Sequence, residues 1–213
     1  MTADTPDTRL ATRLAFLVAG FGIACWAPLV PFATERLQVD DGVLGLLLLC
    51  LGVGSVAAML LTGALSTRYG SRPIVLAGGF GIAVLLPLLA LAGSPVSLGL
   101  TLLAFGAALG SLDVAMNIHA IEVERAAARR LMSGFHALFS VGGFAGATVI
   151  TFLLSSSITP VVSTLFASVL MAIATAFAAP RLLRASRSER TPLIVAPHGI
   201  VLLLAALAFV MFL

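Results

Sequence analysis

The sequence predicts an all-α membrane protein, and two observations lead to this fold class. Of its 213 residues, 60% are hydrophobic and only 10% are charged, against about 45–50% apolar and about 25% charged residues in soluble domains. The apolar residues also gather into runs of roughly 20, the length that a helix needs to cross about 30 Å of hydrocarbon. This composition excludes a soluble globular protein and a disordered chain. A net charge of only +3 excludes a nucleic-acid binder.

Hydropathy divides the chain into six full apolar segments, expected at residues 14–33, 43–65, 74–92, 97–118, 132–154 and 160–179. Residues 1–13 are expected to form a cytoplasmic tail, 14–179 a six-helix transmembrane bundle and 180–198, with its four arginines, a basic cytoplasmic linker. A last segment, 199–213, offers only roughly 22 Å of helix at 1.5 Å per residue. It is therefore expected to be an incomplete seventh transmembrane helix.

The first segment contains residues that a plain membrane span does not need. Two arginines precede it, as in a signal peptide, but it is too long for one and further spans follow it. Pro28 and Pro31 remove backbone donors, so they should bend or break the helix near its end. Trp26 lies just before them, and it is expected either to contact a substrate or to anchor the helix in the aromatic belt.

The arginines predict the orientation of the bundle. Eleven of the twelve lie in one set of helix flanks, and Arg36 alone lies in the alternate set. By the positive-inside rule, the N-terminus and the 180–198 linker are cytoplasmic, and the basic flanks face lipid headgroups.

Asp113 is the acid placed well inside a predicted span, and such a group is costly unless it faces protein or water. Gly106, Gly110, Asp113 and Asn117 follow one another at helical spacing, so they share one face. One interpretation is that Asp113 lines an aqueous cavity and carries a proton through a transport cycle. The alternative is that Asp113 and Asn117 only bond a neighbouring helix, which the two glycines allow to approach closely.

His136 is the second candidate for proton chemistry. Asp113 and His136 are equally far from the middle of the hairpin, near Arg125, so antiparallel helices would bring them to similar depth and allow a proton relay. The alternative is a histidine near the interface that bonds a backbone carbonyl or a headgroup. His119 and His136 lack further ligands for a metal or haem, and Ser55 lacks a suitably placed histidine for catalysis. No metal, no cofactor and no enzymatic activity are therefore expected.

Residues 63–73 carry a recognisable motif, GALSTRYGSRP. It resembles the cytoplasmic signature of the major facilitator superfamily, with Thr67 in place of the motif's acid and Ser71 in place of its first basic residue after the glycine. The resemblance implies a cytoplasmic gating motif formed by Gly63, Arg68, Gly70 and Arg72. Gly63 would permit close helix contact and Gly70 a tight turn. The arginines would reach helix C-termini or the acids of the next hairpin, Glu122 and Glu124.

Residues 112–117 (LDVAMN) and 133–143 (SGFHALFSVGG) look like the fucose-permease-like branch of this superfamily and related uncharacterised bacterial inner-membrane transporters. That branch has an acid and, four residues on, an asparagine in its fourth span, matched here by Asp113 and Asn117. The acid is associated there with proton-coupled sugar uptake. The second acid of the branch, in the first span, has no counterpart here.

The resemblance implies the N-terminal half of a secondary transporter, which moves a small polar solute by alternating access in symport with a proton. The expected proton- and substrate-binding residues are Asp113, Asn117, His136 and Trp26. Membrane lipid, the solute, the proton and a missing C-terminal half or partner chain are the expected partners, and nucleic acid is not one. The alternative is a truncated, non-transporting membrane fragment or a half-subunit that needs a partner.

Overall fold

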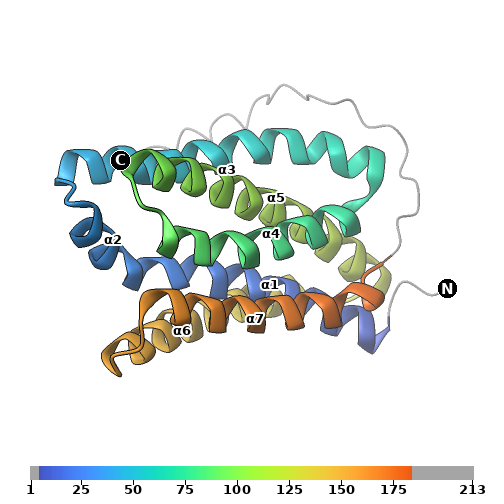
Figure 1. Ribbon diagram of the computed structural model, residues 1–213. Helices are drawn as coiled ribbons and strands as arrows, with labels where there is room; N and C mark the ends of the chain where they lie inside the picture. The colour runs from blue at the N-terminus through green and yellow to red at the C-terminus, as the bar shows by residue number, and fades with distance from the viewer. Residues whose placement is uncertain (1–4, 184–213) are drawn as a thin grey trace.

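The computed structural model describes residues 5–183, and this part of the chain is helical throughout, without a strand. Six helical stretches are long and apolar enough to cross a membrane, which confirms the expected fold class. The predicted seventh helix and most of the predicted linker lie outside the described residues. The helices are α1 (Pro6–Trp26), α2 (Val30–Leu37), α3 (Asp41–Tyr69), α4 (Ser71–Leu91), α5 (Pro95–Ala127), α6 (Met132–Ser155) and α7 (Pro160–Ala178) (Figure 1).

Several helices extend beyond the apolar segments because capping residues, rather than hydropathy, set their ends. The Thr5 side chain accepts a hydrogen bond from the Thr8 N–H, so α1 begins at Pro6, inside the predicted tail. Asp40 caps α3 in the same way, and Ser94 forms a reciprocal capping box with Ser97 at the start of α5. Such caps satisfy N–H groups that have no partner inside the helix.

The prolines of the first span break it, as expected from the sequence. A short 3₁₀ segment, Ala27–Leu29, separates α1 from α2, and Pro28 lies within it. The chain then leaves α2 through Gln38, whose backbone is left-handed with φ of 50°. The first span, Pro6–Leu37, is therefore a long helix and a short one joined by a 3₁₀ turn.

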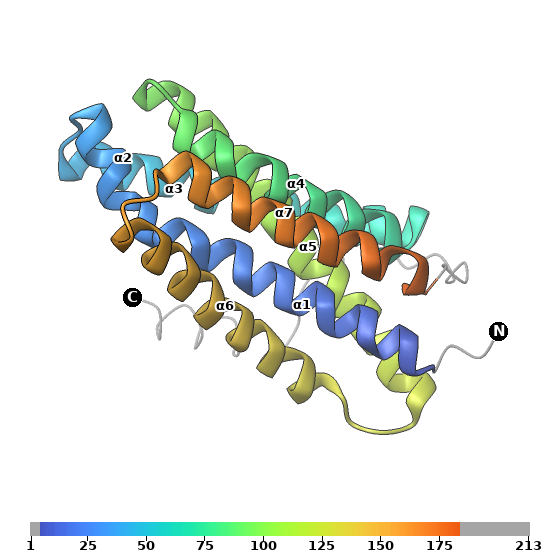
Figure 2. The same cartoon turned by 60° about the horizontal axis from the view of Figure 1, so that its bottom comes forward.

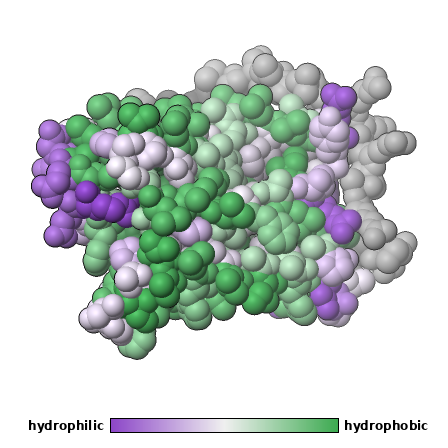
Figure 3. Space-filling view, in the orientation of Figure 1, coloured by the Kyte–Doolittle hydropathy of each residue, from purple (hydrophilic) through white to green (hydrophobic). Residues whose placement is uncertain are grey.

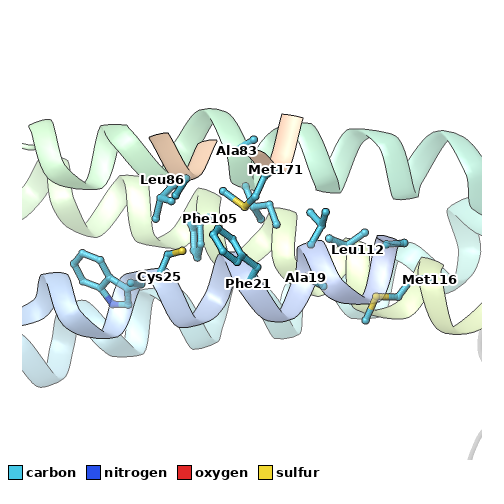
Figure 4. Close-up of a cluster of buried hydrophobic side chains, with 14 of the residues drawn as sticks. Ala19, Phe21, Cys25, Ala83, Leu86, Phe105, Leu112, Met116 and Met171 are labelled. Carbon is cyan, nitrogen blue, oxygen red and sulfur yellow. The ribbon is translucent and has the colours of Figure 1, made fainter. Parts of the chain in front are cut away.

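Four of the long helices enclose the core, and two flank it. α1, α4, α5 and α7 supply the buried side chains at the centre, whereas α3 and α6 are the least buried of the six spans. Phe21 and Phe105 lie beside one another there, with Met171 close by (Figure 4). The side chains labelled in that view are Ala19, Phe21, Cys25, Ala83, Leu86, Phe105, Leu112, Met116 and Met171.

Glycine allows α3 and α5 to touch along their backbones. A Cβ atom added at Gly106 would overlap the backbone carbonyl oxygen of Leu51, and one at Gly110 would overlap that of Ser55. From the other side, a Cβ at Gly54 would overlap the carbonyl oxygen of Leu103. The two helices can lie this close only because the side chains at these positions are absent.

The α1–α6 contact is built in the same way. Added Cβ atoms at Gly142 and Gly146 of α6 would overlap the carbonyl oxygens of Leu17 and Phe21. In return, a Cβ at Gly20 of α1 would overlap the backbone of α6. α1 consequently lies between α6 on one side and α7 on the other (Figure 2).

The surface has the distribution of polarity that a membrane-spanning bundle requires. Apolar side chains cover the middle of the face shown in Figure 3, and polar side chains gather at its two ends. Large exposed apolar residues include Leu60 of α3 and Phe144 of α6. In a bilayer these side chains meet hydrocarbon or another apolar protein surface rather than water.

The glycine contacts make a testable prediction. Replacing Gly106 with Ala should lower the free energy of unfolding by about 1–3 kcal/mol, because the new methyl group forces α3 and α5 apart. Thermal unfolding of the detergent-solubilised protein would measure this as a lower midpoint. Gly52→Ala is the matched control, because a Cβ at Gly52 meets no atom within 4 Å. Equal midpoints for the two variants would contradict the role given to Gly106.

Candidate functional site

Asp113 lies deep within α5. At 1.5 Å per residue, it is roughly 27 Å along the helix from Pro95 and roughly 21 Å from Ala127. Among residues 5–183 it is the one acid more than two turns from the end of its helix. Its side chain is half-buried, so the carboxylate is neither sealed in the core nor fully outside it.

Asn117 lies one turn further along α5 and points back toward Asp113. Its side-chain amide donates to the Asp113 backbone oxygen at 2.9 Å and lies 3.4 Å from the carboxylate oxygen Oδ1. Both bonds are within α5, and Asn117 is also half-buried. The pair therefore forms a small polar patch on one helix, and its hydrogen bonds do not join α5 to another helix in the described part of the chain.

The glycines of the same helix face have a different role from this polar pair. Gly106 and Gly110 pack against α3, so the close-packing interpretation is correct for them. The hydrogen bonds of Asp113 and Asn117, by contrast, stay within α5.

His136 is brought into electrostatic interaction with Asp113. Its imidazole is exposed on α6 and stands edge-on to the buried ring of Phe16 in α1, with 5.1 Å between ring centroids. Phe16 also stacks on Phe135 at 5.7 Å. The histidine is thus held against α1.

The hairpin that joins α5 to α6 is not centred where the sequence analysis placed it. α5 continues to Ala127 and α6 begins at Met132, so the turn follows Arg125 rather than including it. His136 is therefore only about one turn into α6, whereas Asp113 is about four turns from the end of α5. The structure therefore does not place the two side chains at the equal depth that the sequence analysis expected, and α6 packs mainly on α1 rather than on α5.

Trp26 is packed inside the bundle rather than exposed at its surface. Its side chain is 5% exposed, at the end of α1 just before the 3₁₀ segment. The indole N–H has no hydrogen-bond partner among residues 5–183. A buried tryptophan N–H normally has one.

The motif at residues 63–73 joins the end of α3 to the start of α4, and the structure shows what each of its residues contacts among residues 5–183. Gly70 has φ of 81° and ψ of 164°, which confirms that it permits the tight turn between α3 and α4. The Arg72 Nε donates to the carbonyl oxygen of Ala179 at 3.1 Å, at the C-terminal end of α7. Arg68 lies over the ring of Tyr69. A Cβ added at Gly63 would meet no atom within 4 Å, so Gly63 makes no close helix contact with residues 5–183.

The acids of the next hairpin are used locally. One oxygen of the Glu124 carboxylate accepts hydrogen bonds from the N–H groups of Leu131 and Met132, at 2.6 and 2.7 Å. Glu124 thereby caps the start of α6. Glu122 interacts electrostatically with Arg125 of its own helix. Within the described part of the chain, neither acid is paired with an arginine of the 63–73 loop.

His119, which the sequence analysis considered only as a metal or haem ligand, has a structural role. It is buried in α5, its Nε2 accepts from the Leu183 N–H at 3.0 Å, and its Nδ1 lies 3.2 Å from the Thr12 hydroxyl. That hydroxyl itself donates to the Thr8 carbonyl, so the imidazole donates from Nδ1. With both nitrogens occupied, His119 is not free to bind a metal. The signal in the sequence was a polar side chain on a helix face that is otherwise apolar, because a buried polar group needs hydrogen-bond partners.

Comparison with known proteins identifies the family. The Major Facilitator Superfamily model matches residues 13–213. The chain belongs to the major facilitator superfamily. This family is typically non-enzymatic, and its members are membrane transporters with several transmembrane helices.

Three curated bacterial relatives agree with this result. An uncharacterized MFS-type transporter of Yersinia pestis is 48% identical over 206 residues, which cover 96% of this chain and 54% of the relative. An uncharacterized transporter, y4wD, of Sinorhizobium fredii is 37% identical over 62% of this chain and 35% of its own length. The membrane protein MosC of Rhizobium meliloti is 31% identical over 65% of this chain and 34% of its own. The chain thus spans about half the length of the first relative, and its matches cover about a third of the other two.

The geometry of the superfamily loop makes a second testable prediction. Gly70→Ala should lower the free energy of unfolding by about 1–3 kcal/mol, because its φ and ψ lie in a region that is essentially restricted to glycine. The midpoint of thermal unfolding in detergent measures the change.

Gly63→Ala is the control within the same motif. It adds a methyl group in open space inside a helix, where Ala is favoured over Gly by about 0.5–1 kcal/mol. A loss of stability at Gly63 equal to that at Gly70 would show that the turn is not what distinguishes the two glycines.

Proposed function

We propose that this chain is the N-terminal half of a proton-coupled secondary transporter, which moves a small polar solute by alternating access. The observation that carries the proposal is the half-buried Asp113 carboxylate, deep in α5 and beside the Asn117 amide. An ionisable group at this depth in a membrane helix is costly unless it faces protein or water, and such groups mark ion or substrate pathways. Secondary transporters of this kind bind solute and ion near the bilayer midplane, between two halves.

Each residue of the site has a distinct role in this proposal. Asp113 binds and releases the proton that drives the cycle. Asn117 contacts the solute, because an amide offers both a donor and an acceptor to hydroxyl groups. His136 modulates Asp113 through the electrostatic interaction between them. Trp26 supplies a further contact to the solute, for which its unpartnered indole N–H is the support.

The resemblance of residues 112–117 and 133–143 to the fucose-permease-like branch supports symport with a hydroxylated solute. The branch's second acid is missing from the first span, so in this half the proton depends on Asp113. The surroundings of the site agree with an uncharged or cationic solute, since no arginine of residues 5–183 lies within α5 before Arg125.

The proposed setting is a bacterial inner membrane, with the N-terminus in the cytoplasm. The distribution of arginines supports this orientation. Gly63, Arg68, Gly70 and Arg72 would then lie on the cytoplasmic side, where they gate the transport path. The open surface beside Gly63 suits close contact with a second half, because no described residue fills it.

A partner half is also part of the proposal. His136 and Ser140 are exposed on α6 although both are polar and lie within a predicted span. Such side chains are covered when a second surface encloses the path. The second candidate function, a non-transporting half that only packs against a partner, rests on the same exposure.

Asp113→Asn tests the proton-binding role. It should abolish proton-driven uptake while exchange of solute across the membrane remains possible, because an amide cannot release a proton but leaves the shape of the site unchanged. Because the proposal requires both halves, uptake and exchange are measured in proteoliposomes that contain this chain together with the C-terminal half of the Yersinia pestis relative, with and without a proton gradient.

Asp41→Asn is the matched control, because Asp41 is an exposed acid in the first turn of α3. Both variants should reach the membrane in normal amounts. Unchanged gradient-driven uptake by Asp113→Asn would falsify the assignment of Asp113.

Co-expression separates the two candidate functions. The chain alone should show no uptake, and co-expression with the C-terminal half of the Yersinia pestis relative should restore gradient-driven uptake, because the halves together enclose the site. Uptake that stays absent although the two halves co-purify would favour the non-transporting half.

A further inference from the structure

A groove opens at the end of the bundle where α2 lies, away from the candidate transport site. Its volume is about 340 Å³. Three elements form its walls: α2, the C-terminal end of α4 and the N-terminal end of α7. The lining residues are Phe32, Glu35, Arg36, Ala90, Pro160 and Val161.

One wall of the groove holds a fixed positive charge. The Arg36 guanidinium donates to the backbone oxygen of Ala90 and, at 3.1 Å, to that of Leu89. These carbonyls belong to the last turn of α4, which otherwise has no partners for them. A guanidinium carries five N–H donors, so others remain for a ligand.

The neighbouring residue supplies a negative charge. Glu35 is exposed, and its carboxylate accepts no hydrogen bond from residues 5–183. Glu35 and Arg36 both line the groove, so it presents an anion-binding and a cation-binding group side by side. A ligand that matches both is a zwitterion.

The remaining walls are apolar, and the groove lies where the spans end. α4 ends at Leu91 and α7 begins at Pro160, so this is the level at which helices pass from hydrocarbon to headgroups. Phe32 and Val161 offer apolar surface next to the two charges. A ligand here would have a zwitterionic end and an apolar continuation.

We propose that this groove binds a phosphatidylethanolamine molecule, with its phosphate on Arg36 and its ammonium on Glu35. The first carbons of its chains lie along Phe32 and Val161. Charge-assisted hydrogen bonds of both signs hold the headgroup, and the fixed guanidinium needs no rearrangement to receive it. The proposal is independent of the transport function, because it uses none of the residues of the Asp113 site.

The chemistry predicts which lipids bind poorly. A phosphatidylcholine has the same phosphate and charge, but its trimethylated nitrogen has no N–H to donate to Glu35. A phosphatidylglycerol has no cation at all. A water-soluble glycerophosphoethanolamine has the full zwitterion but lacks the apolar chains.

Lipid binding by the full chain in detergent, followed by native mass spectrometry with lipids of equal chain length, tests the proposal. Phosphatidylethanolamine should bind at least about tenfold more tightly than phosphatidylcholine, since hydrogen bonds to charged groups contribute about 1.5–3 kcal/mol. Glu35→Gln should remove this preference. Asp41→Asn should keep it, because Asp41 is an exposed acid that does not line the groove.

The opposing outcomes are equally definite. Equal affinity for the two lipids in the unmodified protein, or a preference that survives Glu35→Gln, would overturn the proposal. Glycerophosphoethanolamine that displaces the lipid at comparable concentration would show that the ligand is a soluble zwitterion and not a membrane lipid. Arg36 is left unchanged throughout, because its substitution would also uncap α4.

Discussion

The close approach of helix backbones at glycine is the contact on which the rest of this bundle depends. In a bilayer the hydrophobic effect does not drive one helix against another, so packing must come from van der Waals contact over closely matched surfaces. The α3–α5 and α1–α6 pairs achieve it by facing a carbonyl oxygen with a glycine. Because Gly106 and Gly110 fix one face of α5 against α3, the position of Asp113 around that helix is fixed as well.

The two glycine-packed pairs are related in their order along the chain. α1, α3 and α4 are the first three spans, and α5, α6 and α7 are the second three; the first helix of each set packs on the second helix of the other. Paired repeats of this kind are common in secondary transporters. The chemistry does not repeat, however, because α5 carries Asp113 whereas α1 carries no acid beyond its first turn. The repeat provides the same scaffold twice, and the sequence places the carboxylate in one copy.

Hydropathy was sufficient to predict the six spans, because the thickness of the bilayer fixes how many apolar residues a spanning helix needs. It could not predict helix ends, which depend on single side chains such as Thr5 and Ser94. The hairpin was misplaced for the same reason: Glu124 caps α6 from within α5, so the charged residues near Arg125 are helical. The bonds of His119 were also beyond prediction, because they join Thr12 and Leu183, which are far apart in the sequence.

Arginine has two separable tasks in this bundle. Most arginines lie at one end, where their number predicts orientation. Arg36 and Arg72 instead donate to backbone oxygens at the C-terminal ends of α4 and α7, the third helix of each set of three spans. Cations are stabilising at that end of a helix. Because α4 and α7 run in opposite directions, as the third and sixth spans of the bundle, their C-termini lie at opposite ends of it. One capping arginine must therefore lie on the side that the positive-inside rule leaves poor in charge, which gives the exception at Arg36 a structural cause.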